Sequence, residues 1–456
     1  MIYTNFPLIL CKFAQNIELI TPFNHRIMER NIYQELCKWK SSTRRKPLIL
    51  EGARQVGKTW IVRHFGENEY AHVAYINFEE MKNLRGLFTV DFNVERVMRA
   101  IRLATGCPCV AGETLIFLDE IQDAEGGLTM LKYFFENMPE QHIIVAGSLL
   151  GIELHRKESF PVGKVDFLRM YPMTFIEFLR AVGETAMADL IISADWQTIA
   201  LFSQQLTERL RQYYFVGGMP EAVQAYANEA LPVEIRHIQN SILQSYDNDF
   251  SKHAPNELVP RIRLVWDSIP SQLSRENRKF IYGLVKEGAR AREFEAALMW
   301  LCDCGLTYKV KAVKTPKYPL KSYEDQSAFK LFTIDVGLLC AQMDVEPSLL
   351  LQKNDIFTEF KGALTEQYVM QQLLPYHTLY YWSKPNSQAE VDFVIQQDGN
   401  VVPIEVKAED NLRAKSLRLF IDTFAPACAY RLSMSDYRKE SQLTNIPLYA
   451  IAACVN

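Results

Sequence analysis

The sequence lacks the features that mark a membrane protein or a secreted protein. No run of apolar residues approaches the roughly 20 that a helix needs to cross a bilayer. The opening MIYTNFPLILCKFAQ has no basic stretch before its apolar segment, and Lys12 interrupts that segment early, so it is a poor secretory signal. We therefore expect a cytoplasmic protein with no membrane partner.

Zinc-binding cysteine spacings and an excess of basic charge are missing as well. The nine cysteines include two C-x-C pairs, but none stands at the C-x-x-C spacing of a structural zinc site. We expect reduced and mostly packed thiols. The formal net charge of −4 excludes a surface that is basic throughout, so any contact with DNA has to use a local patch.

Internal repeats and low-complexity segments are also absent, and the composition is that of a globular protein. The 456 residues are 48% hydrophobic and 23% charged, and this length exceeds what one hydrophobic core usually supports. Shifts in pattern predict five parts: an N-terminal extension (1–27), an α/β domain (28–185), a helical lid or linker (186–255), a winged-helix-like segment (256–315) and a second α/β domain (316–456).

Short apolar segments alternate with amphipathic helical patterns in residues 28–185. The segments PLILEG, HVAYINFE, TLIFLDE and HIIVAGS each predict a strand, and each is too apolar for a sheet with one face in water. This alternation predicts a parallel sheet with helices on both faces.

The first of these strands runs into GARQVGKT, which fits the phosphate-loop pattern G-x-x-x-x-G-K-[ST]. Glycines let the chain bend until successive backbone N–H groups converge on an anion, and the following helix adds its unpaired N-terminal donors. The lysine supplies a charge for the β and γ phosphates, and the threonine supplies a hydroxyl for Mg²⁺. The predicted ATP-binding residues are Gly52, Ala53, Arg54, Gln55, Val56, Gly57, Lys58 and Thr59.

Two further strand ends carry polar side chains that suit ATP hydrolysis. Asp119 ends the strand TLIFLDE, and we predict that it holds Mg²⁺ together with Thr59. Glu120 is suited to polarise the water that attacks the γ phosphate. Ser148, which follows IIVAG, is placed to sense the γ phosphate or to orient that water, and an ordinary Gly-Ser turn is the alternative. The predicted catalytic residues are Lys58, Glu120 and Ser148.

The phosphate loop, the strand-end Asp-Glu and the strand-end Ser, in this order and spacing, resemble the AAA-type branch of P-loop ATPases. More narrowly, GARQVGKT, FLDEIQ, AGSLLG, YPMTFIEFL and GGMPEAV resemble a prokaryotic family of AAA-like ATPases. In that family the C-terminal half is a domain of unknown function with a restriction-endonuclease-like core. The resemblance implies ATP binding with Mg²⁺, ATP hydrolysis, and an α/β restriction-endonuclease-like domain after the helical segments.

Such ATPases commonly use an arginine finger, often from a neighbouring subunit, so the resemblance also implies a homo-oligomer. Relatives often carry Gly-Arg after the sensor segment, where this chain has Gly163 and Lys164. Lysine is a point charge and does not replace the bidentate guanidinium. Arg156 and Arg169 are the nearby candidates, and both the identity of the finger and the need for a homo-oligomer stay open.

Acidic residues and one lysine recur in the C-terminal part of the sequence. Glu405 and Lys407 stand two apart on the predicted strand PIEVK and therefore face the same side. With Asp392 on the strand EVDFVI, and Glu366 on a preceding helix, they resemble the PD-(D/E)XK nuclease signature, although Val391 replaces its proline. Such a pocket suits Mg²⁺. Two interpretations stay open: a nuclease, and a degenerate nuclease fold that serves as a scaffold or binding site.

Two hypotheses for the whole chain follow. The first is a Mg²⁺-dependent ATP hydrolase whose nucleotide state is coupled to a C-terminal DNA-interacting or nuclease-like module. Lys286, Arg290 and Arg292, near the start of a predicted recognition helix, are the candidate patch for DNA, and an ordinary solvated helix face is the favoured alternative. The second is an ATP-controlled regulatory switch that binds a protein partner and carries an inactive nuclease-like domain.

Overall fold

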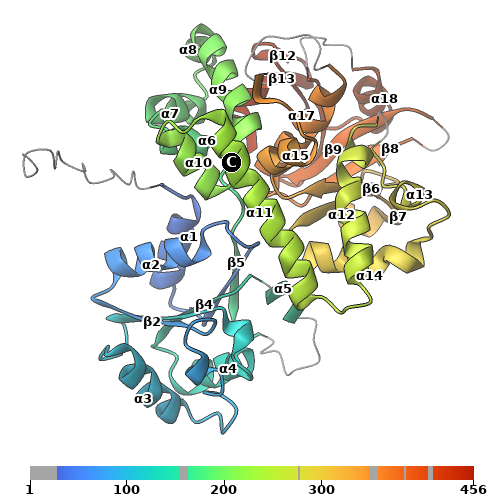
Figure 1. Ribbon diagram of the computed structural model, residues 1–456. Helices are drawn as coiled ribbons and strands as arrows, with labels where there is room; N and C mark the ends of the chain where they lie inside the picture. Colours follow the sequence, from blue (N-terminus) through green and yellow to red (C-terminus); the bar gives the residue numbers. More distant parts are fainter. Residues whose placement is uncertain are drawn as a thin grey trace, which may run out of the picture.

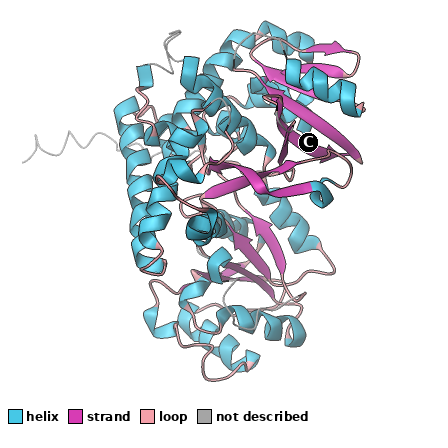
Figure 2. Cartoon of the chain, turned by 90° about the vertical axis from the view of Figure 1, so that its right-hand side faces the viewer, coloured by secondary structure: helices cyan, strands magenta, loops and turns pink. Residues whose placement is uncertain are grey.

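The computed structural model describes residues 28–148, 150–153, 163–275, 278–348, 358–384, 387–408 and 414–455. These residues form two separate β-sheets, with a group of helices beside and between them (Figures 1 and 2). The extension predicted for residues 1–27 lies outside the described residues. Within the described ranges, every helix is too short or too polar to span a bilayer.

The N-terminal sheet has five strands in the order β2-β3-β4-β1-β5, and every pair of neighbours is parallel. Its strands alternate with helices along the chain, which is the arrangement of a P-loop NTPase fold and confirms the predicted sheet. The strands are β1 (Leu48–Glu51), β2 (His72–Asn77), β3 (Thr114–Asp119), β4 (His142–Ala146) and β5 (Asp166–Arg169).

Helices cover both faces of this sheet. Leu48 and Leu50 belong to a buried cluster with α1 and α2, whereas Ile49 belongs to a second cluster with α3 and α4. The inner strand β3 is buried along its whole length, on both faces of the sheet. In the edge strand β2 only Ala74 and Ile76 are buried, so the buried side chains of this strand lie on one face only. The helices are α1 (Ile32–Ser41), α2 (Lys58–Glu69), α3 (Val94–Thr105), α4 (Gly127–Asn137) and the short α5 (Leu150–Glu153).

Helices dominate the middle of the chain, as the sequence predicts. The longest, α11, has 22 residues and reaches from the side of the C-terminal half to the N-terminal domain (Figure 1). The helices are α6 (Phe175–Ala181), α7 (Thr185–Ser193), α8 (Trp196–Leu201), α9 (Ser203–Val216), α10 (Pro220–Ala227), α11 (Pro232–His253), α12 (Val259–Leu273), α13 (Tyr282–Val285) and α14 (Ala291–Asp303).

The C-terminal sheet has eight strands in the order β12-β13-β11-β10-β9-β8-β6-β7, with both parallel and antiparallel neighbours. The strands are β6 (Thr307–Val313), β7 (Glu324–Thr333), β8 (Tyr380–Ser383), β9 (Glu390–Gln397), β10 (Asn400–Val406), β11 (Ala429–Ser433), β12 (Arg438–Glu440) and β13 (Leu443–Pro447). The helices are α15 (Val336–Gln342), α17 (Thr358–Leu373), α18 (Lys415–Phe424) and α19 (Ala452–Val455).

β6 follows the three helices from which we predict a winged-helix-like segment. It pairs with β7 in antiparallel and with β8 in parallel fashion, inside the large C-terminal sheet. The strand at the end of residues 256–315 is therefore part of the C-terminal sheet, and the winged-helix-like character of that segment stays a prediction.

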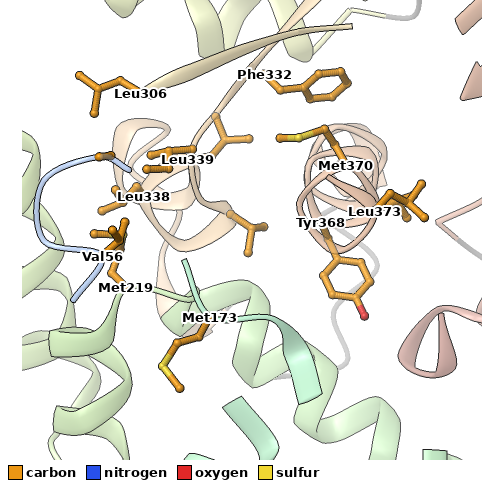
Figure 3. Close-up of a cluster of buried hydrophobic side chains, with 14 of the residues drawn as sticks. Val56, Met173, Met219, Leu306, Phe332, Leu338, Leu339, Tyr368, Met370 and Leu373 are labelled. Atoms are coloured by element: carbon orange, nitrogen blue, oxygen red, sulfur yellow. The ribbon is translucent and has the colours of Figure 1, made fainter. Parts of the chain in front are cut away.

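One buried cluster runs from the N-terminal sheet through the middle helices to the C-terminal sheet. Figure 3 shows part of it: Val56, from the loop after β1, lies beside Met219 and the α15 side chains Leu338 and Leu339. Val56 is fully buried. The loop after β1 therefore packs against the C-terminal half of the molecule.

The motif GGMPEAV, residues 217–223, connects α9 to α10 at this junction. The Gly218 amide donates a hydrogen bond of 2.6 Å to Asp335 Oδ2, and Gln371 Nε2 donates to the same oxygen at 2.9 Å. Asp335 also caps α15 by accepting from the Leu338 amide. Burial raises the pKa of Asp335, while these hydrogen bonds oppose the rise. The motif thus fixes the middle helices to the C-terminal half.

Candidate functional site

Residues 52–59, which comprise the loop after β1 and the first two residues of α2, have a backbone that suits phosphate binding and are called the P-loop below. Gly52 has φ 148° and Gly57, which precedes α2, has φ 96°. A Cβ atom at Gly52 would lie 2.5 Å from the Met170 carbonyl oxygen, so only glycine fits there. The backbone amides at the start of α2 have no acceptors within the helix, an arrangement that suits an anion.

Lys58 folds back over the P-loop. Its side chain is buried, and Nζ donates hydrogen bonds of 2.8 Å to the carbonyl oxygens of Gly52 and Ala53. Burial lowers the pKa of Lys58 to about 8, although the carboxylates of Glu120 and Asp119 oppose the shift. A phosphate group in the loop would stabilise the protonated ammonium further.

Thr59 and Asp119, the predicted Mg²⁺ ligands, lie against each other. Thr59 Oγ1 donates a 2.6 Å hydrogen bond to Asp119 Oδ2, and the Tyr75 hydroxyl donates to the same oxygen at 3.3 Å. Burial raises the pKa of Asp119, while the bond from Thr59 lowers it. Hydroxyl and carboxylate oxygens are the ligand type that Mg²⁺ prefers, so the pair fits the ion.

Glu120 and Ser148 also meet, at the carboxyl ends of β3 and β4. The Ser148 amide and hydroxyl both donate to Glu120 Oε2 at 3.3 Å, and Gln122 Nε2 donates to the same oxygen at 2.5 Å. Glu120 has a left-handed backbone conformation, φ 49°, which turns its side chain off the strand direction. Gln122 stands in the FLDEIQ segment, and no sequence pattern marks it as a site residue.

Arg30 contacts the P-loop from the N-terminal side, and no motif marks it. It is 8% exposed; Nη1 donates to the Val56 carbonyl oxygen at 3.0 Å and Nη2 to that of Tyr171 at 2.6 Å. Nε forms an ion pair of 3.1 Å with Glu177, whose other oxygen closes a capping box with Thr174 on α6. Arg30 therefore holds the P-loop against the segment YPMTFIEFL.

The P-loop is bonded from the opposite side by α11. Arg54 Nη1 forms an ion pair of 2.6 Å with Asp249, and the Tyr246 hydroxyl donates a 3.0 Å hydrogen bond to the Arg54 carbonyl oxygen. Tyr246 is fully buried, whereas Arg54 is partly exposed. Two contacts from one helix turn thus reach the loop that would hold the phosphates.

A narrow cleft separates the edge of the N-terminal sheet from the turn between α14 and β6. A Cβ atom built on Gly305 in that turn would lie 3.5 Å from the Ala53 amide nitrogen, so the turn packs closely on the P-loop. The cleft is lined on one side by Glu51, Gly52, Gly147, Ser148 and Arg169, and on the other by Asp303, Cys304, Gly305 and Tyr308. The turn between α14 and β6 therefore covers the side of the P-loop on which Ser148 lies.

The candidates for an arginine finger have different surroundings. Arg169 lines the cleft and forms an ion pair with Glu51, Nη2 to Oε2, of 2.7 Å. Lys164 instead forms a 3.4 Å ion pair with Glu136 on α4. Arg156 lies outside the described residues. Among the described candidates, Arg169 alone lines this cleft.

The C-terminal residues that we singled out come together in the second sheet. Lys407 Nζ forms a 2.6 Å ion pair with Glu405 Oε1, and the Val406 amide donates to Asp392 Oδ2 at 2.8 Å. Glu366, on α17, is joined to Asp392 through a shared cation, Lys330. The sequence pattern therefore identified four residues of one cluster.

Two cations in this cluster were missed. Lys330 on β7 is 0% exposed, and its Nζ lies 2.6 Å from Glu390, 3.4 Å from Glu366 and 3.7 Å from Asp392. Arg278 donates to Glu366 through Nη1. Neither residue lies in a recognisable motif, since Lys330 is far from the EVDFVI and PIEVK strands in sequence.

The charges in this cluster act strongly on one another. Burial would lower the pKa of Lys330, but the carboxylates of Glu366, Glu390 and Asp392 outweigh it and raise the pKa. Burial would raise the pKa of Glu366, but Arg278 and Lys330 keep it below its usual value. For Asp392, burial and the neighbouring carboxylates raise the pKa well above the usual range.

The basic residues proposed for DNA contact are exposed around the start of α14. Lys286, Arg290 and Arg292 are all open to solvent, with the exposed acidic residues Glu287 and Glu293 between and beside them. The patch is therefore local and of mixed sign.

Comparison with protein families gives three matches along the chain. Residues 44–179 match a family model described as an AAA domain. Residues 207–349 and 361–451 match two domains of unknown function, DUF8612 and DUF4143. The restriction-endonuclease-like core predicted for the C-terminal part therefore stays a prediction. Comparison with curated proteins finds no match.

Three solved structures align with much of the chain at low similarity. They are the ORC1 protein of Aeropyrum pernix in complex with DNA (14% identity, TM-score 0.27, covering 69% of this chain and 90% of that one), Drosophila ORC bound to DNA (14%, 0.26, 76% and 95%) and Cdc6p from Pyrobaculum aerophilum (15%, 0.25, 72% and 95%). TM-scores this low carry no argument about fold or function. The family match, the parallel sheet and the P-loop identify residues 44–179 as an AAA-type domain of the P-loop ATPase class.

Proposed function

We propose that the protein is a Mg²⁺-dependent ATP hydrolase whose nucleotide state controls the C-terminal half of the same chain. The observation that carries this proposal is the set of contacts that the P-loop makes with the middle helix α11 and with α15 of the C-terminal half. Tyr246 and Asp249 of α11 bind Arg54, and Val56 packs beside α15. A loop that changes shape when phosphates enter would move these contacts.

The chain's own residues divide the work of hydrolysis in this proposal. Lys58 contacts the β and γ phosphates, and Thr59 and Asp119 hold Mg²⁺, which when bound neutralises charge on the phosphate oxygens. Glu120 accepts a hydrogen bond from the attacking water and polarises it. Ser148, which already contacts the Glu120 carboxylate, orients the γ phosphate toward that water.

Calorimetric titration with Mg-ATP and measurement of phosphate release test this assignment. Lys58→Ala should abolish tight binding, since it removes the charge that faces the phosphates. Glu120→Gln should retain binding and slow hydrolysis by about 100-fold or more. Lys132→Ala, on α4 of the same domain, is the matched control and should change neither. Absence of Mg-ATP binding by the unaltered protein would remove the proposal.

A specific contact favours a second candidate, an ATP-controlled switch that binds a protein partner and turns over slowly. Gln122 Nε2, at 2.5 Å, and the Ser148 hydroxyl both donate to Glu120 Oε2, so this oxygen is already engaged and would have to be released before it could bind the attacking water. Gln122→Ala separates the two candidates. A switch should hydrolyse ATP faster once Glu120 is released, whereas an enzyme that already uses Glu120 fully should keep its rate or lose part of it.

The partners of the C-terminal half belong to the same proposal. Exposed Lys286, Arg290 and Arg292 support contact with DNA phosphates, and binding through them should weaken as salt rises. Replacing all three by Ala should remove that salt dependence. A finger supplied by a second copy would make turnover per subunit rise with protein concentration, whereas Arg169 acting within one chain would leave it constant.

A further inference from the structure

The acidic cluster of the C-terminal sheet is built from distant parts of the chain. β9 contributes Glu390 and Asp392, α17 contributes Glu366 and β10 contributes Glu405. β7 places Lys330 among them. These four carboxylates and the lysine belong to four separate elements, so the cluster depends on the complete fold of the domain.

Lys330 lies where the carboxylates converge. Its ammonium is fully buried and lies within 4 Å of three different carboxylates, at 2.6 Å from Glu390, 3.4 Å from Glu366 and 3.7 Å from Asp392. The Tyr381 ring is 5.2 Å from the same nitrogen and adds a cation–π contact. A buried cation with three anionic neighbours and an aromatic face has the surroundings that a bound ion would have.

The protein's own cations neutralise all but one of the formal negative charges of the cluster. Four carboxylates (Glu366, Glu390, Asp392 and Glu405) face three cations (Lys330, Arg278 and Lys407). A divalent cation among these carboxylates would stand close to the Lys330 ammonium, and in a buried site such repulsion is only weakly screened. The cation already present therefore opposes a second one.

Among the described residues, one carboxylate oxygen of the cluster is buried and has no hydrogen-bond partner. Glu405 Oε2 is buried and has no hydrogen-bond partner among the described residues, while its Oε1 binds Lys407. Across the described part of the chain, no three carboxylate, imidazole or thiolate side chains are placed to share a metal ion. Asp392 and Glu366, the other oxygens that would complete such a set, are turned toward Lys330.

We propose that the Lys330 ammonium takes the place of a divalent cation in this pocket, so that the C-terminal domain is held together by an internal cation and cleaves no nucleic acid. The strands and the helix that would carry a metal-dependent nuclease site are instead joined by a buried ion-pair cluster. This inference is independent of the ATPase proposal, because none of its residues contacts the P-loop in the described contacts.

Titration of the nucleotide-free full chain with Mn²⁺, followed by electron paramagnetic resonance, tests the proposal. All proteins carry Asp119→Asn, so that the P-loop site contributes nothing to the signal. The chain with Lys330 intact should take up no Mn²⁺. Adding Lys330→Met should create a site for one ion between Glu366, Asp392 and Glu405, and a further Asp392→Asn should remove it.

The matched control is Lys309→Met, which removes a lysine from the neighbouring strand β6 and should create no Mn²⁺ site. Uptake of one Mn²⁺ by the chain with Lys330 intact, lost with Asp392→Asn, would overturn the proposal whether or not the Lys330 variant folds. A folded Lys330→Met protein that takes up no Mn²⁺ would also overturn it. Plasmid DNA incubated with Mn²⁺ and the unaltered chain should stay intact, and cleavage that depends on Asp392 would contradict the inference.

Discussion

The Tyr246 hydroxyl, on α11, donates a 3.0 Å hydrogen bond to the backbone carbonyl oxygen of Arg54 in the P-loop. The two residues are 192 positions apart in sequence, and the phenol is fully buried. This partly buried hydrogen bond to the backbone favours one shape of the loop, because breaking it would leave polar groups without partners. The P-loop and α11 are therefore mechanically connected.

Asp249→Asn should tighten ATP binding. The Asp249 carboxylate neutralises Arg54, so removing its charge leaves a free guanidinium beside the phosphates. We expect affinity to rise roughly threefold at low salt and the gain to shrink as salt is added, since Arg54 is partly exposed. Calorimetric titration with Mg-ATP measures both effects.

Asp247→Asn is the matched control for that change. Asp247 lies on the same helix but pairs with Arg263 of α12, so its loss should leave ATP affinity unaltered. Equal effects of the two substitutions, or weaker binding by the Asp249 variant, would show that Arg54 has no influence on the phosphates.

Arg30→Met should destabilise the fold and weaken ATP binding. The substitution leaves Glu177 buried without its ion-pair partner and removes the donor to the Val56 carbonyl. Breaking a buried pair in this way costs about 3 kcal/mol of unfolding free energy. Urea unfolding gives the loss of stability, and the KM for ATP should rise because the P-loop is less firmly held.

A second substitution separates the effect of the unpaired Glu177 charge from the effect of the lost Arg30 packing. Adding Glu177→Gln should restore part of the stability, because the neutral amide no longer leaves a buried charge. The exposed Arg44→Met is the control and should change little. A loss of under about 1 kcal/mol in Arg30→Met, the size expected of a surface ion pair, would contradict a buried role.

His142 should make stability depend on pH between pH 7 and pH 5. Burial, with Arg45 and Lys40 nearby, lowers the pKa of His142 from 6.5 to about 4. Below pH 6.5 the unfolded chain therefore binds a proton at His142 that the folded protein does not bind, and the free energy of unfolding decreases as pH falls. The loss should reach about 2 kcal/mol at pH 5.

The contribution of His142 is isolated by comparing variants. In His142→Gln this part of the pH dependence should disappear, whereas the exposed His72→Gln should retain it. Urea unfolding at pH 7, 6 and 5 gives the free energies. Parallel curves for the unaltered protein and His142→Gln would show that the imidazole is not held neutral by the fold.

The parts of the site that could be predicted from sequence are those encoded by neighbouring residues. The P-loop geometry follows from two glycines, a lysine and a threonine within eight positions, and Asp119, Glu120 and Ser148 follow from the rule that parallel strands end at one edge of the sheet. Contacts across the fold carry no such local signal. Arg30, just before α1, and Asp249, within α11, contact the P-loop from two sides, and no local motif marks either residue.

The C-terminal cluster shows the same limit in a sharper form. Period-two alternation placed Glu405 and Lys407 on one face of a strand, and the structure brings Asp392 and Glu366 beside them. The sequence pattern contains no information on the buried cation. Lys330 lies on the edge strand β7, which β8 and β6 separate from β9 in the sheet. Its presence changes the interpretation of the pocket from a metal site to an ion-pair cluster.

Hydrogen exchange of the Glu120→Gln chain, measured with and without Mg-ATP, tests the central claim most directly. If the P-loop transmits its state, ATP should change amide protection around Tyr246 and Asp249 on α11 and in the turn between α14 and β6, as well as in the P-loop itself. Changes confined to residues 44–179, with α11 and that turn exchanging as before, would contradict the account.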